Sequence, residues 1–86
     1  MITSKMRKRK PTRQICGYTV PNPPRTATHV ALDTEDGKKA VVRIEDFNTL
    51  EGSAGTIFYV RKDHKGRVTE EFPNKYIWTG KEVLFQ

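Results

Sequence analysis

The order of apolar and polar positions along the chain predicts short strands separated by turn residues. Residues 14–20 are rich in β-branched and aromatic side chains, so they predict a first strand. The prolines of residues 21–24 end it, because proline cannot donate a ladder hydrogen bond. Residues 28–34 and 38–45 carry further β-branched and apolar positions and predict a second and a third strand.

The link between the second and third strands, Glu35-Asp36-Gly37, is predicted to be a three-residue hairpin loop. A two-residue loop would set Val30 opposite Arg43 and leave the apolar faces out of phase. A three-residue loop, with Gly37 in the left-handed region of a G1 bulge, aligns the two apolar faces. The expected cross-strand pairs are Thr28–Ile44, Val30–Val42, Leu32–Ala40, Ala31–Val41 and the oppositely charged Asp33–Lys39.

The middle of the chain predicts one short helical turn followed by a strand. Residues 46–51 suit the helical turn, which Gly52-Ser-Ala-Gly55 interrupts. Residues 56–62 predict a fourth strand. Both of its faces are apolar, which is typical of a strand in the centre of a sheet. The strand register beyond residue 56 stays open.

The last part of the chain predicts two short strands. Residues 67–72 follow a turn at residues 63–66 and predict a fifth strand, which Pro73-Asn74 ends. Residues 75–78 predict a last short strand. The expected fold is all-β: a small five- to six-stranded antiparallel meander or barrel of the OB or SH3-like kind, with at most one short helical turn.

The formal net charge of +6 lies entirely in residues 1–13. This segment holds six of the 16 Lys and Arg residues and no acid, whereas the remaining 73 residues hold ten of each sign. Adjacent like charges repel and no apolar pattern is present, so residues 1–13 are expected to form a disordered basic arm. The small β domain is expected to span residues 14–80.

The end of the chain, Glu82-Val-Leu-Phe-Gln86, resembles the recognition sequence of picornaviral 3C-type proteases, which cut after the glutamine. We interpret residues 81–86 as the remnant of tag removal, and we assign no function to the residues from Glu82 onward. The alternative interpretation is a native C-terminal strand.

The residues that carry most enzyme and metal chemistry are sparse. Cys16 is the single cysteine, and His29 and His64 do not share a metal-ligand spacing with it. Gly52-Ser-Ala-Gly55 lacks the Lys-Ser/Thr of a phosphate loop and precedes a strand. We therefore expect no catalysis, no small-molecule substrate, no cofactor and no metal.

The cellular setting is expected to be cytoplasmic or otherwise intracellular. A lone thiol without a secretory leader suits a reducing compartment. No apolar run approaches the ~20 residues that span a bilayer, so we expect no membrane contact.

Cations and aromatic residues predict where a polyanion would bind. Lys and Arg neutralise phosphates, and aromatic rings beside them can stack on bases. Phe58, Phe72 and Trp78 are assigned instead to the core, which a domain this small needs. The candidate binding residues are Lys5, Arg7, Lys8, Arg9, Lys10 and Arg13 in the arm, Arg61, Lys62, Lys65 and Arg67 around the later hairpin tip, and Tyr59, Lys75 and Tyr76.

Two functions of different class fit this pattern. The first is a small basic protein that binds DNA or RNA through the arm and the hairpin tip. The second is a virus-type inhibitor, similar in profile to anti-CRISPR and other anti-defence proteins of phages. Such an inhibitor would place its arm in an acidic cleft of a host nucleic-acid-handling protein, or pair its fifth or sixth strand with a sheet edge of that protein.

Overall fold

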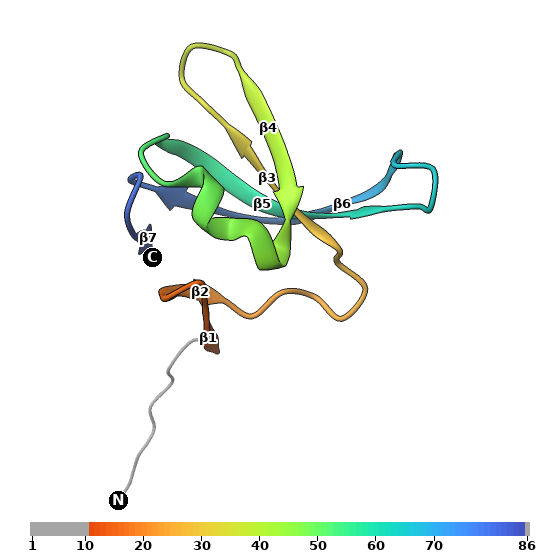
Figure 1. Cartoon of the computed structure of the whole chain (residues 1–86), viewed down its shortest axis with the longest axis horizontal. Helices are drawn as coiled ribbons and strands as arrows, with labels where there is room; N and C mark the ends of the chain where they lie inside the picture. Colours follow the sequence, from red (N-terminus) through yellow and green to blue (C-terminus); the bar gives the residue numbers. More distant parts are fainter. Residues whose placement is uncertain (1–10, 86) are drawn as a thin grey trace, which may run out of the picture.

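The computed structural model describes residues 11–85, which form two antiparallel sheets and one short helix (Figure 1). A two-stranded sheet pairs β1 with β2, and a five-stranded sheet has the order β4-β3-β5-β6-β7 and curls into a half-barrel. The predicted fold class, a small all-β barrel-like domain, is confirmed. The elements are β1 (Thr12–Ile15), β2 (Tyr18–Pro21), β3 (His29–Asp33), β4 (Lys39–Arg43), the 3-10 helix η2 (Ile44–Leu50), β5 (Gly55–Lys62), β6 (Val68–Trp78) and β7 (Val83–Leu84).

The β3–β4 hairpin forms as predicted, with the three-residue loop. Val30 lies opposite Val42, Leu32 opposite Ala40 and Asp33 opposite Lys39. Gly37 has a φ of 88°, the left-handed conformation that closes this loop. The register sets Val30 and Leu32 on the face that packs into the core.

The predicted first strand is wrong, because the chain reverses within it. Cys16 and Gly17 have φ values of 55° and 86°, and they form a two-residue turn between β1 and β2. Thr12 and Arg13, predicted as part of the arm, begin β1. Cys16 therefore lies at an exposed hairpin tip and not in a strand.

The predicted break at Pro73-Asn74 is also wrong, because β6 continues through it for 11 residues. The register against β5 shifts between the pairs Phe58–Lys75 and Val60–Glu71, so three residues of β6 lie opposite Tyr59 alone. A proline is tolerated where a bulge leaves residues outside the ladder. The bulge therefore merges the predicted fifth and last strands into one.

The main core lies between one face of the five-stranded sheet, η2 and the β1–β2 hairpin. Trp78 is 1% exposed, and its indole N–H donates to the Leu50 carbonyl at 2.9 Å. Its ring meets Phe47 edge to face, with the ring centroids 4.8 Å apart. Phe47 and Leu50 are the two buried residues of η2, so this helix closes the core over the end of β6.

The C-terminal segment takes part in this packing. Val83 in β7 pairs with Trp78 and is buried in the core, while Leu84 pairs with Ile77 and is exposed. Residues 83 and 84, predicted to belong to a tag remnant, therefore form the last strand of the sheet.

On the opposite face of the sheet lies a second, smaller apolar cluster, and all of its residues come from the strands of the sheet itself. Alternation along the strands places Ala31, Val41, Phe58 and Val60 on this side, and we call it the open face. The apolar side chains Val68, Ile77 and Leu84 lie on the same side by register and are 43–45% exposed.

Candidate nucleic-acid interface

The tip of the β5–β6 hairpin is fixed by Asp63. Its carboxylate accepts the backbone N–H groups of Lys65 and Arg67, each at 2.9 Å, and pairs with the Arg67 guanidinium at 3.5 Å. A carboxylate that accepts two backbone N–H groups holds a turn in one shape. The cations at the tip are therefore displayed from an ordered turn.

The four predicted tip cations do not form one patch. Arg61 lies opposite Glu70 and Lys62 opposite Val68, and neighbouring strand residues point to opposite faces. Lys62 therefore projects on the open face and Arg61 on the other side. Among the ion pairs of residues 11–85, Arg67 is paired with Asp63, whereas Arg61, Lys62 and Lys65 have no carboxylate partner within 4.0 Å.

Tyr59 is not available as a stacking ring, contrary to the prediction. It is 6% exposed in the main core, and its hydroxyl donates to the Pro21 carbonyl at 2.5 Å. Burial raises the pKa of Tyr59 far above its usual value, the nearby Tyr76 raises it further, and Arg13 opposes the shift. This residue is a structural link between β5 and the end of β2.

Lys75 and Tyr76 project from opposite faces of β6. Lys75 lies opposite Phe58, and its ammonium sits over the Phe58 ring, 4.9 Å from the centroid. The Lys39 ammonium approaches the same ring at 5.6 Å. Both distances are within the range of cation–π attraction. Phe58 is 2% exposed, as expected for a core residue. On the open face, these two lysines cover its ring.

The open face also carries two cations that the sequence-based list of binding residues omits, Lys39 and Arg43 on β4. Lys39 lies 4.0 Å from Asp33 and 3.9 Å from Glu71, and Arg43 lies 3.7 Å from Glu45. All five of these side chains are about half or more exposed, so the pairs are weak and the cations can exchange partners. The predicted hairpin register already placed Lys39 and Arg43 on the same face as Ala31.

His29 joins this cationic side of the sheet. It lies opposite Arg43 on β4 and Val60 on β5, as the hairpin register implies. Burial lowers the pKa of His29, and the positive charges of Lys62 and Arg43 lower it further, against a smaller effect of Glu45. His29, Arg43 and Lys62 therefore converge at one end of the open face.

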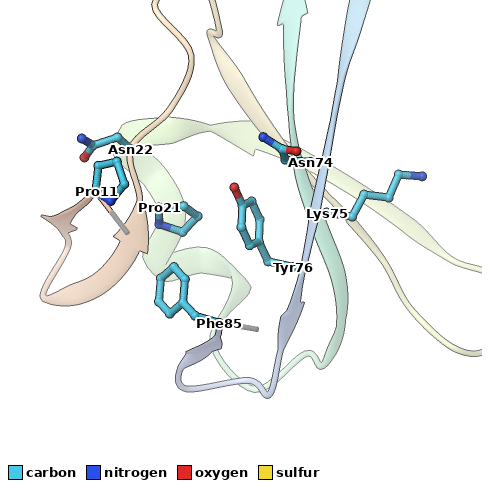
Figure 2. Close-up of a pocket in the computed structure, with 7 residues that line it drawn as sticks. All are labelled: Pro11, Pro21, Asn22, Asn74, Lys75, Tyr76 and Phe85. Atoms are coloured by element: carbon cyan, nitrogen blue, oxygen red, sulfur yellow. The ribbon is translucent and has the colours of Figure 1, made fainter. Parts of the chain in front are cut away.

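A groove of about 440 Å³ lies between the β1–β2 hairpin and β6 (Figure 2). Pro11, Pro21 and Asn22 form one side, and Asn74, Lys75, Tyr76 and Phe85 form the other. Figure 2 shows the rings of Tyr76, Pro21 and Phe85 turned toward one another, while the ammonium of Lys75 points away. The Tyr76 and Phe85 rings meet edge to face with centroids 6.1 Å apart.

The predicted arm residues Lys5, Arg7, Lys8, Arg9 and Lys10 lie outside the described residues. Arg13 is exposed on β1. The tip of the β5–β6 hairpin projects away from β1 in Figure 1. The described residues of the predicted site therefore lie in four separate regions: β1, the groove, the open face and the hairpin tip.

Within residues 11–85, no three His, Cys, Asp or Glu side chains are grouped as metal ligands would be. The Cys16 thiol donates to the Glu45 carbonyl at 3.1 Å, which ties the β1–β2 turn to η2. That contact gives the cysteine a structural role.

The one helix among the described residues, η2, is too short to cross a membrane.

The fold and these surfaces define a small all-β domain with a cationic sheet face and an aromatic groove. Comparison with protein-family models, with curated proteins and with solved structures found no match to this chain.

Proposed function

We propose that this protein is a non-catalytic nucleic-acid-binding protein that holds phosphates with its N-terminal arm and with the cations of the β5–β6 hairpin. The observation that carries the proposal is the distribution of charge. Residues 1–10 hold five Lys and Arg residues and no acid, whereas residues 11–85 are close to neutral. Each cation that neutralises a phosphate releases a condensed counterion, which favours binding.

The described surface supports a second point of contact for the same strand. Lys62 and Lys65 near the hairpin tip have no carboxylate partner among the described ion pairs, and Lys62 shares the open face with Lys75 and Lys39. Lys75 and Lys39 lie over an aromatic ring, whose attraction holds them in place. A phosphate backbone that follows the open face would therefore meet cations along its path.

The length of the arm is compatible with contacts on the body. Residues 1–10 can extend to at most about 35 Å from Pro11, because an extended chain spans about 3.5 Å per residue. A phosphate backbone bound by the arm would therefore lie within this distance of Pro11.

The test replaces the five cations Lys5, Arg7, Lys8, Arg9 and Lys10 with glutamine, which keeps the chain length and leaves β1 intact. Affinity for a fluorescein-labelled oligonucleotide, measured by anisotropy at about 100 mM salt, is expected to fall about 10-fold or more. A matched control replaces three exposed cations elsewhere on the body, Arg25, Lys38 and Lys81, and is expected to bind nearly as the wild type does. Equal affinities for the arm variant and the wild type would rule the proposal out.

A second candidate function, an inhibitor that docks on a host nucleic-acid-handling protein, is favoured by the position of β4 at the edge of the five-stranded sheet. Ala40 and Val42 bond to β3, so the alternation of an antiparallel ladder turns the N–H and C=O groups of Val41 outward. This edge contains no proline or bulge, unlike β6, and an extended segment of a partner could pair with it.

Val41→Pro tests this candidate, because it removes an outward N–H that β3 does not use. A protein partner that binds by strand pairing would be retained by the wild type at moderate salt and lost by the variant. Retention by both, or by neither, would count against docking at this edge.

A further inference from the structure

We infer that the groove between β2 and β6 accepts one unstacked base of a single-stranded nucleic acid, with the Tyr76 ring as the stacking platform. This inference rests on the proposed function and names the form of nucleic acid that the protein prefers. Such a site requires a preformed groove, a lining that suits a base, and phosphate-binding cations close to it.

Two hydrogen bonds fix the β2 side of the groove in place. The Tyr59 hydroxyl donates to the Pro21 carbonyl at 2.5 Å, and the Asn22 N–H donates to the Pro11 carbonyl at 3.2 Å. On the other side, Tyr76 lies opposite Ile57 in the β5–β6 ladder. Both sides are anchored to the five-stranded sheet, so the groove exists before any ligand arrives.

The lining of the groove suits a flat aromatic ligand with polar edges. Tyr76 and Pro21 provide apolar surfaces, and every base has a π-face that stacks on a ring. The side-chain amides of Asn22 and Asn74 line the same space, and none of the hydrogen bonds described within residues 11–85 involves them. A carboxamide can donate and accept at once, as recognition of a base edge requires.

The charge around the groove suits the phosphates on either side of such a base. Its lining includes no Asp or Glu. Pro11 is one of the lining residues, and it follows the cation Lys10 directly in the sequence. A base can enter the groove only from a strand that is not paired, so the expected ligand is single-stranded.

The test compares Tyr76→Leu, which removes the ring, with Tyr76→Phe, which keeps it. The probes are a labelled 12-nucleotide single-stranded DNA and the duplex of the same sequence. Tyr76→Leu is expected to lower affinity for the single strand by about 5- to 160-fold, the range for the loss of one stacked base. Affinity for the duplex should be unchanged, and Tyr76→Phe should bind both probes as the wild type does.

A second measurement needs no variant. A 2-aminopurine base placed within the single-stranded probe is expected to lose fluorescence when the wild-type protein stacks it. Unchanged fluorescence at saturation, or a Tyr76→Leu variant that binds the single strand as tightly as Tyr76→Phe does, would overturn the inference.

The arm variant separates this inference from the proposed function. If neutralising residues 5–10 weakens binding of both probes but Tyr76→Leu weakens neither, the arm binds nucleic acid and the groove does not hold a base. If neutralising the arm has no effect on either probe, the proposed function itself fails.

Discussion

Tyr59 shows how one side chain links the two sheets. Its ring packs in the main core, while its hydroxyl reaches the Pro21 carbonyl at the end of β2. Pro21 is itself buried, so no solvent replaces that hydroxyl if it is removed. The position of the β1–β2 hairpin, and with it one side of the groove, depends on this contact.

Tyr59→Phe is expected to lower the free energy of unfolding by about 1–3 kcal/mol, because it leaves a buried carbonyl without a donor. Urea unfolding followed by tryptophan fluorescence measures the change. Tyr76→Phe is the matched control, since the described hydrogen bonds do not involve the Tyr76 hydroxyl. Equal losses in the two variants would show that the hydroxyl of Tyr59 does not carry the link.

The burial of Tyr59 predicts an alkaline limit to stability. The folded-state pKa of Tyr59 is raised above the ordinary value of 10.0, so the folded protein keeps a proton that the unfolded chain loses. Stability from this group is complete below about pH 10 and falls as the pH rises from there, by up to ~1.4 kcal/mol per pH unit. Tyr59→Phe should unfold with a flatter dependence between pH 9 and pH 11, and a dependence as steep as that of the wild type would contradict the assignment.

At the scale of elements, Asp63 holds the β5–β6 hairpin tip. Asp63→Ala removes the acceptor of two backbone N–H groups and is expected to destabilise the fold by about 1–2 kcal/mol. Hydrogen exchange should show faster exchange of the Lys65 and Arg67 amides. Asp63→Asn retains an oxygen acceptor and should lose less, so an equal loss in both variants would point to the charge pair with Arg67.

The sequence predicted well the strands whose pairing partner is the next strand along the chain. The β3–β4 register followed from matching two adjacent apolar patterns across a loop that ends in Gly37. The prediction failed at Cys16, because few residues other than glycine adopt a positive φ and the apolar pattern continued through the turn. The predicted end of the strand at Pro73 was also wrong, because β6 continues there through a bulge. Whether a bulge forms depends on the pairing with the partner strand, which the sequence of one strand does not show.

At the scale of the whole molecule, the sequence shows where the cations lie along the chain, but it does not show which residues share a surface in the fold. The excess of cations in residues 1–13 is a property of the sequence alone. The open face, in contrast, requires the order β4-β3-β5-β6, which brings Lys39 and Lys75 to the same ring of Phe58. The groove likewise joins Pro11 to Tyr76, which are distant in sequence, so no local pattern could predict it.

In the proposed function, the arm is the main source of phosphate contacts. The salt dependence of binding measures this most directly, because the slope of log affinity against log salt counts the phosphates neutralised. For a single-stranded oligonucleotide, replacing Lys5, Arg7, Lys8, Arg9 and Lys10 with glutamine should reduce the steepness of this slope by about 3.5. An arm variant with the same slope as the wild type would contradict the account.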